Sequence, residues 1–323
     1  MTQAKRFWNI YLSLALSLFF CFNVNAQEFP KVIKLVVPFA PGASNDLFAR
    51  ALAQRLSAKL DFTMIVENKA GAGGVIGADF VSKATPDGST LLFTSNALTT
   101  TAAVQRKLPY DPLTDLVPVA MVAKSGLILL VRTDGPYGNT AELLQAMRDP
   151  KNKMAYGSSG VGSVNHVSTE LLNSMAGTSA LHLPYKGLSL ALIDMIGGRV
   201  DFIITTVASS GSQLRAGKVK ALSVTSAERS PFNPELAPMA DFVPGYSSEI
   251  WWGVFAPANT PKALVERLNT EIRNVTAEPE MQKLFAQEAA LATKLSSPEF
   301  GRRIQDEIAL WKKVVRERNI QPE

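Results

Sequence analysis

The sequence contains very little cysteine and histidine. Its 323 residues include one Cys and two His. The single cysteine, Cys21, lies in an apolar run near the N-terminus, which excludes a disulfide framework and leaves the rest of the chain without a thiolate. Two histidines, with no EF-hand or H-E-x-x-H pattern, give no recognisable metal site. We therefore expect no metal and no cofactor, and a fold stabilised by an apolar core.

A strong net charge is also lacking. The sequence has 33 Lys and Arg residues against 28 Asp and Glu, a formal net charge of +5. The basic residues are interspersed with acidic ones, which excludes the basic stripe typical of nucleic-acid-binding proteins. The small positive excess gives a weak field that slightly favours anionic ligands.

The first 26 residues have the three-part pattern of a secretory signal peptide. Lys5 and Arg6 form a basic start, residues 8–22 are almost entirely apolar, and residues 24–26 (VNA) are those a signal peptidase reads. The alternative is a retained membrane anchor, but the apolar run is shorter than the ~20 residues of a spanning helix. The pattern predicts cleavage before Gln27, export to the periplasm and a soluble, monomeric mature chain.

The remaining chain alternates β-rich runs with helical patterns, which indicates an α/β fold with largely parallel strands. Removing 26 of the 323 residues leaves 297, a length at which one hydrophobic core usually divides into two. The first long helix is expected at residues 46–60, because its apolar residues recur at steps of three and four. Strands are expected at residues 32–37, 63–66, 90–94, 153–156, 181–184, 200–204 and 221–225.

Two segments are expected to connect two lobes. The apolar stretch 117–131 can hold two consecutive strands that leave the first lobe, and residues 251–256 resemble a strand that returns to it. The last sixty residues show helical patterns without an obvious strand and would pack on the first lobe. The prediction is a first lobe of residues 27–122 and 251–323, and a second lobe of residues 123–250. Two connections favour a hinge over independent domains.

The first candidate ligand site is the loop of residues 38–46, between the first strand and the first long helix. Ser44 or Asn45 is expected to cap this helix, whose first N–H groups and positive dipole end would face a carboxylate. Gly42 would let a ligand approach the backbone closely.

A second loop of this kind, residues 157–163, also lies between a strand and a helical pattern. Ligands of open α/β sheets collect outside the carboxyl ends of the strands, so each lobe would present one loop to the cleft between them. Two facing helix N-termini could hold an anion without an arginine. The alternative is that both loops are ordinary capped helix starts.

Two other patterns have structural explanations. A G-x-G-x-x-G fingerprint starting at Gly71 fails because Ile76 stands at its last position, so a tight loop before a helix is expected. His166 lies close in sequence to Ser158, but there is no G-x-S-x-G elbow. A hydrogen bond that orders the loop is therefore favoured for His166 over a Ser/His hydrolase site.

A series of short motifs runs along nearly the whole chain. They are residues 35–42 (LVVPFAPG) with Asp46, 67–74 (ENKAGAGG), 86–88 (PDG), 108–112 (LPYDP), 156–160 (YGSSG), 184–187 (PYKG) and 216–218 (AGK). In this order they resemble the Bug-type solute receptors of tripartite tricarboxylate transporters. The resemblance implies the type II periplasmic binding protein fold, in which two α/β lobes joined by two crossover segments enclose a ligand cleft.

The resemblance further implies a binding protein without enzymatic activity. It would capture a small carboxylate, held largely by main-chain N–H groups, and deliver it to membrane transporter subunits; the alternative is a receptor that feeds a membrane signalling partner. The ligand-binding residues that it implies are Phe39, Ala40, Pro41, Gly42, Ala43, Ser44, Asn45, Asp46, Ser95, Asn96, Ser158, Ser159, Gly160, Val161, Gly162, Ser163, His166, Thr205 and Thr206.

The sequence departs from the family pattern at two places. Ala43 replaces the second glycine of the familiar Pro-Gly-Gly, and Thr205 and Thr206 stand where many relatives have an acidic residue. An acid there would suit a ligand amine, so its replacement favours a ligand without an amino group.

Overall fold

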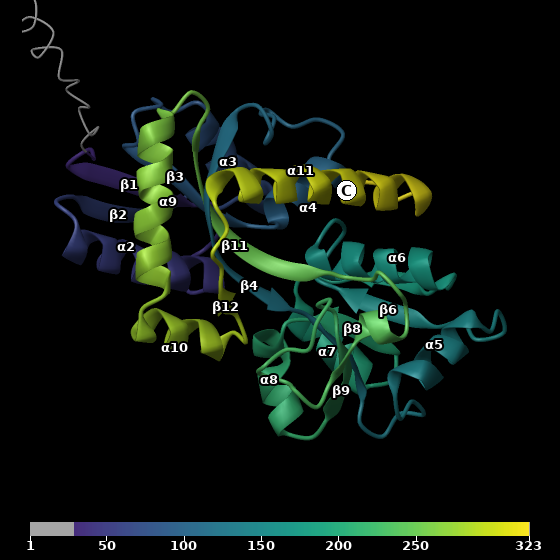
Figure 1. The fold of residues 1–323 in the computed structure, drawn as a ribbon. Helices are drawn as coiled ribbons and strands as arrows, with labels where there is room; N and C mark the ends of the chain where they lie inside the picture. Colours follow the sequence, from purple (N-terminus) through teal and green to yellow (C-terminus); the bar gives the residue numbers. More distant parts are fainter. Residues whose placement is uncertain (1–28, 323) are drawn as a thin grey trace, which may run out of the picture.

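The chain forms two lobes, each built around a six-stranded sheet with helices packed against it (Figure 1). The computed structural model describes residues 29–322. The predicted signal peptide lies outside these described residues. The two separate sheets confirm the predicted two-lobed α/β architecture.

The first sheet has the strand order β12-β4-β11-β3-β1-β2. β1 pairs in parallel with β2 and β3, whereas β11 runs antiparallel to β3 and β4. Its strands are β1 (Val32–Val37), β2 (Thr63–Asn68), β3 (Thr90–Ser95), β4 (Leu116–Gly126), β11 (Glu249–Pro257) and β12 (Leu291–Ala292).

The second sheet has the strand order β10-β9-β5-β8-β6-β7. β6 pairs in parallel with β7 and β8, and β5 runs antiparallel to β8 and β9. Its strands are β5 (Ile128–Arg132), β6 (Ala155–Ser158), β7 (Leu181–Pro184), β8 (Phe202–Thr205), β9 (Val219–Val224) and β10 (Ala237–Pro238).

The expectation of largely parallel pairing was wrong, because antiparallel pairs are as prominent as parallel ones in both sheets. The antiparallel pairs involve β4, β5, β11 and β12. β4, β5 and β11 flank the two connections between the lobes, and their direction follows from the path of the chain out of one sheet and back into it. The parallel pairs are those of the βαβ units on either side.

Thr225 lies where the two connections pass side by side. The first runs from β4 through Leu127 into β5, which confirms two consecutive strands within residues 117–131. The buried Thr225 hydroxyl accepts the Leu127 N–H at 2.8 Å and donates to the Ser248 carbonyl at 2.6 Å. Its backbone also pairs with both segments. Because one residue holds both connections, they form a single joint between the sheets.

The helices of the first lobe cover both faces of its sheet. In α2, Phe48, Leu52 and Leu56 recur every four residues and are fully buried in the core. The helical segments associated with this lobe are α2 (Ser44–Lys59), η1 (Ala72–Gly74), α3 (Val75–Ser82), α4 (Ala97–Val104), α9 (Lys262–Thr276), α10 (Pro279–Gln287) and α11 (Ser297–Glu317).

The helices of the second lobe are shorter on average. α6 (Val164–Ala176) buries Val167, Leu171 and Leu172 in the core of this lobe. The other helical segments are α5 (Thr140–Arg148), α7 (Leu188–Ile196), α8 (Val207–Arg215) and η2 (Met239–Asp241). In residues 29–322, no helix has both the length and the apolar character needed to cross a membrane.

The last helix, α11, packs on the first lobe and also contacts the second lobe, a contact that the sequence analysis did not predict. Its N-terminal half packs on the first-lobe core through Phe300 and Ile304. Trp311 and Val314 belong to the core of the second lobe. Its 21 residues extend about 30 Å at 1.5 Å per residue, which is enough to reach across the joint. Figure 1 shows it lying over α4 and extending towards α6.

Candidate functional site

The first candidate loop leads from β1 into α2. The helix begins after Ala43, which makes no side-chain cap, so the prediction that Ser44 or Asn45 caps the helix was wrong. The Ser44 hydroxyl instead donates to Glu288 at 2.9 Å. Ala43 therefore provides no side-chain acceptor for the N–H groups of the first turn.

Asp46 braces this loop. Its carboxylate accepts the Gly42 N–H at 3.1 Å, Arg50 Nε at 2.9 Å and Asn68 Nδ2 at 2.9 Å. Burial raises the pKa of this carboxyl, but the hydrogen bonds outweigh burial and hold the pKa below its ordinary value. The Asp46 charge is therefore already paired with groups of the protein. Gly42, whose N–H it accepts, adopts a φ of +90°.

The second candidate loop leads from β6 into α6. Ser163 is the N-cap, and its hydroxyl accepts the His166 N–H. The Gly162 N–H donates to His166 Nδ1 at 3.0 Å, which confirms the prediction that His166 orders the loop through a hydrogen bond. Ser159 Oγ donates to Asn165 at 2.8 Å.

His166 and His182 stack on each other below this loop. Their ring centroids are 3.8 Å apart, and Tyr156 stacks on His182 at 4.9 Å. Burial and the neighbouring His182 lower the pKa of His166 to about 3, so this imidazole is neutral at pH 7. The histidine that contacts Ser158 is His182, at 2.6 Å, and Ser158 is completely buried.

A cavity of about 470 Å³ lies between the lobes. The first lobe contributes Phe39, the ends of η1 and β3, and one side of α4, while the second lobe contributes the loop before α6. The lining residues are Phe39, Ala72, Gly73, Ser95, Asn96, Ala97, Thr100, Thr101, Val104, Gln105, Ser159, Val161, Gly162, Ser163, Val164 and Ile250. Parts of both candidate loops thus border one cavity.

The structure therefore brings together seven of the predicted residues. Those that line the cavity are Phe39, Ser95, Asn96, Ser159, Val161, Gly162 and Ser163. The predicted residues that are not part of its lining are Ala40, Pro41, Gly42, Ala43, Ser44, Asn45, Asp46, Ser158, Gly160, His166, Thr205 and Thr206. Thr205 is buried at the end of β8, and Thr206 caps α8 by accepting the Ser209 N–H.

The sequence analysis did not identify α4 or the glycine-rich loop of residues 71–74 as parts of the cavity wall. Ala97, Thr101 and Gln105 are four residues apart on α4, as are Thr100 and Val104, which places them on one side of the helix. This spacing was the available signal, but alanine and threonine side chains are not specific to ligand sites. The glycine loop is a tight turn before α3, as predicted, with Gly73 at a φ of +65°.

The two lobes come into close contact at one edge of this cavity. A Cβ placed on Gly162 would lie 3.2 Å from the Val104 side chain of α4. Val104 is buried among residues of the second-lobe core, although its helix belongs to the first lobe. A larger residue at position 162 would therefore need the Val104 side chain to shift by a few tenths of an ångström.

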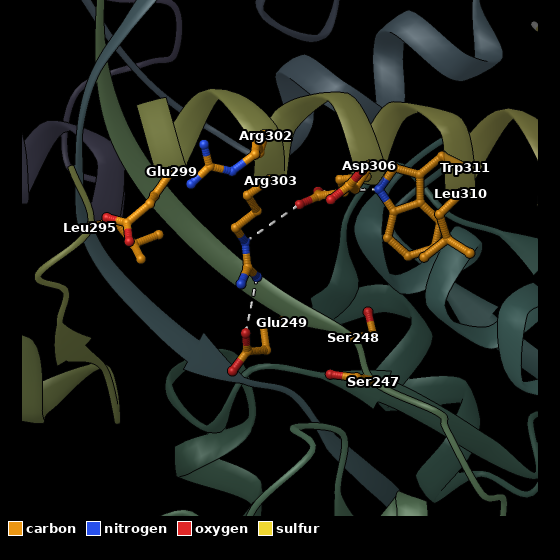
Figure 2. Close-up of a pocket in the computed structure, with 11 residues that line it drawn as sticks. Ser247, Ser248, Glu249, Leu295, Glu299, Arg302, Arg303, Asp306, Leu310 and Trp311 are labelled. Carbon is orange, nitrogen blue, oxygen red and sulfur yellow. Dashed lines mark hydrogen bonds and ion pairs between the residues drawn. The ribbon is translucent and has the colours of Figure 1, made fainter. Parts of the chain in front are cut away.

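A second cavity, of about 500 Å³, lies beneath α11 (Figure 2). Arg303 projects into it, binds Glu249 at 3.0 Å and lies 3.9 Å from Glu307. Its lining comes from β11, from the segments before β11 and α11, and from α11 itself, so the two candidate loops do not enclose it. Within residues 29–322, no group of three His, Cys, Asp or Glu side chains could hold a metal ion.

Comparisons with known proteins agree with this geometry. Residues 48–320 match the family described as "Tripartite tricarboxylate transporter family receptor". The protein BugT of Bordetella pertussis is 33% identical over 298 residues, which cover 91% of each chain. An R. palustris protein solved with adipate is 34% identical with a TM-score of 0.77, covering 90% of this chain and 98% of that one. MatC from Rhodopseudomonas palustris, solved with bound malate, is 29% identical with a TM-score of 0.73, covering 91% and 100%.

Proposed function

Because the chain belongs to the receptor family of the tripartite tricarboxylate transporters, we propose that it captures a small carboxylate in the cavity between its lobes and delivers it to a membrane transporter. Family members and structural neighbours are solute-binding receptors, so binding and release constitute the activity. The ligand would meet both lobes and shift an equilibrium between open and closed arrangements.

One observation carries this proposal: both lobes line the same cavity. A ligand that contacts Asn96 on one side and Ser163 on the other stabilises the closed arrangement in proportion to its extra contacts there. The joint at Thr225 would allow the lobes to rotate, and we place the division between them at Leu127 and Ser248.

The chemistry of the lining suits a carboxylate that is recognised without an arginine. Among the described residues that line the cavity, none carries a charged side chain. The donors are hydroxyls, the amides of Asn96 and Gln105, and the first N–H groups of α4 and α6, where the helix dipoles favour a negative group. The adipate and malate bound to the two relatives are small carboxylates, and we extend this ligand class to the present chain.

The proposed location is the periplasm. Periplasmic binding proteins are among the structural neighbours, and the N-terminal 26 residues have the signal-peptide pattern described above. N-terminal sequencing of the protein exported by a bacterial host tests this part. A mature chain that begins at Gln27 is expected, and an intact N-terminus in the membrane fraction would contradict it.

A thermal-shift screen of organic acids tests the ligand class. The protein is unfolded and refolded first, so that any ligand carried through purification is removed. A ligand at a hundredfold excess over its dissociation constant adds about 2.7 kcal/mol to the free energy of unfolding, which gives a readily measured shift. The screen includes adipate, malate, succinate, glutarate, benzoate and butyrate, with glucose and a quaternary amine as controls. Equal shifts for all compounds, or none, would contradict the proposal.

A further inference from the structure

α4 has one side in the proposed ligand cavity and another side against α11. Asn96, Ala97, Thr100 and Thr101 at its start line the cavity. Thr99 does not line it and is completely buried, with its hydroxyl 2.7 Å from Glu307 Oε1. The first turn of α4 is thus attached to α11 on the side that does not face the cavity.

The Glu307 carboxylate connects three separate elements. Besides the Thr99 hydroxyl, it accepts Nε1 of Trp251 at 2.8 Å and Nε1 of Trp311 at 3.2 Å. Only about a tenth of its side chain is exposed, and burial raises the pKa of its carboxyl. α4, β11 and α11 therefore meet at one carboxylate, on the side of α4 away from the cavity.

A second contact fixes the residue that precedes α4. Asn96 Nδ2 donates to the Glu249 carbonyl at 3.2 Å, while Asn96 itself lines the cavity. The Glu249 side chain is held in turn by Lys124 at 2.8 Å. Figure 2 shows its other contact, with Arg303 at 3.0 Å. The start of α4 is therefore attached at two points, through Asn96 to Glu249 and through Thr99 to Glu307. Arg303 contacts both of these acids.

We propose that Glu307 is a positioning residue for the ligand cavity, which acts through the Thr99 hydroxyl to fix the first turn of α4. This rests on the proposed binding function. Recognition by N–H groups, hydroxyls and amides depends on their placement, because each contributes only at a short distance and a favourable angle. A shift of the first turn would misplace Asn96 and the nearby N–H groups without removing any group that touches the ligand.

A purely structural role would have a different signature. If Glu307 and Thr99 only stabilise the fold, their replacement lowers the free energy of unfolding and leaves the affinity of the folded protein unchanged. Thr276 provides the matched control, since it is also almost fully buried and its hydroxyl donates to the Arg273 carbonyl in α9, outside the cavity.

The experiment measures dissociation constants for adipate and malate by calorimetry, at a temperature where circular dichroism shows every variant to be folded. The variants are Thr99→Val, Thr99→Ser, Glu307→Gln, the double variant T99V/E307Q, and Thr276→Val. Thr99→Ala replaces Thr99→Val if the valine variant does not fold.

We expect Thr99→Val and Glu307→Gln each to weaken binding about tenfold, which corresponds to about 1.4 kcal/mol, the scale of one lost hydrogen bond to the ligand. Thr99→Ser keeps the hydroxyl and should stay within about twofold of the unmodified protein. The double variant should bind no more weakly than the poorer single variant, because Glu307 is proposed to affect the cavity through the Thr99 hydroxyl and the two losses would then not add. Thr276→Val should lose stability but not affinity.

Two results would overturn the inference. One is a folded Thr99→Val protein with unchanged affinity, and the other is additive losses in the double variant. If the unmodified protein binds neither adipate nor malate, nor any other acid of the screen, the proposed function itself fails, and the positioning role fails with it. Binding by the unmodified protein therefore tests the proposed function, and the variants test the positioning role of Glu307.

Discussion

Arg318, the residue after α11, binds Glu170 of α6 with 2.5 Å between Nε and Oε2. The first half of α11 packs on the first lobe, so this ion pair fixes the second-lobe end of a helix that both lobes share. Glu170 also accepts the Tyr156 hydroxyl at 2.5 Å. Because α6 begins at the candidate ligand loop, the C-terminal helix is connected to that loop through a single helix.

Replacing Arg318 by methionine should lower the free energy of unfolding by about 1–3 kcal/mol. Removing one partner of a fully buried ion pair costs about 3–5 kcal/mol, and the expected loss is smaller because 24% of the Arg318 side chain is exposed and solvent screens the pair. Urea titration measures the change. The control is Lys313→Met, whose partner Glu317 lies 3.8 Å away at the surface and which should cost less than about 0.5 kcal/mol. Equal effects of both substitutions would contradict an interlobe role for the Arg318 pair.

Gly162→Ala should weaken ligand binding as well as destabilise the fold. Its φ of +76° is unfavourable for alanine, and the added Cβ would press on Val104 across the cavity edge. Gly177 is a matched control, with a φ of +65° and no atom within 4 Å of an added Cβ. Gly177→Ala should therefore cost about 1 kcal/mol with unchanged affinity. Adipate titration of both variants measures the difference, and a Gly162→Ala protein with normal affinity would show that closure does not need this contact.

Local patterns were sufficient to predict most of the elements. The buried run at Val32–Val37, the four-residue spacing in α2 and the strand at Leu181–Pro184 each depend on residues near one another in the sequence. The hydrogen bond by which His166 orders its loop was predicted correctly for the same reason, since its partner Gly162 is only four residues away.

The errors came from partners that are distant in the sequence. Ser44 does not cap α2 because it is already the first residue of the helix, and its hydroxyl donates to Glu288, 244 residues later. The wall role of α4 depends on Glu307 and on the second-lobe loop, and neither leaves a pattern within residues 97–104. Helical periodicity predicts which residues of α11 are buried but not the lobe against which they pack. The contact of Trp311 with the second lobe therefore could not be predicted from the sequence.

The cavity should discriminate against ligands with an amino group. The acids next to the cavity are already engaged: Asp46 accepts three hydrogen bonds, and Glu249 pairs with Lys124 and Arg303. A buried ammonium group would lack a carboxylate partner and would meet the positive ends of α4 and α6. Calorimetry should therefore show at least about tenfold weaker binding of aspartate than of succinate.

The substitution Thr101→Asp tests the cause of this discrimination. Thr101 lines the cavity and is partly exposed, so an acid is tolerated there. The carboxylate should weaken succinate binding by repulsion and raise the affinity for aspartate relative to succinate by about tenfold. Thr101→Asn has nearly the same shape without the charge and should leave the ratio unchanged. Tighter binding of aspartate by the unmodified protein would contradict the prediction.

His166 should make stability fall as the pH decreases below about 6.5. The folded protein holds the pKa of His166 at about 3, below the ordinary 6.5, so between these values the unfolded chain takes up a proton that the folded protein does not. The free energy of unfolding therefore decreases on acidification by up to about 1.4 kcal/mol per pH unit. Above pH 6.5 this contribution is fully retained.

His166→Asn isolates the effect, because the asparagine carbonyl can still accept the Gly162 N–H but does not titrate. Urea unfolding at pH 7 and pH 5 should show the unmodified protein losing about 1–2 kcal/mol more than the variant over this interval. If the two proteins lose equal stability between pH 7 and pH 5, the prediction is wrong, because the fold then does not keep the His166 ring uncharged.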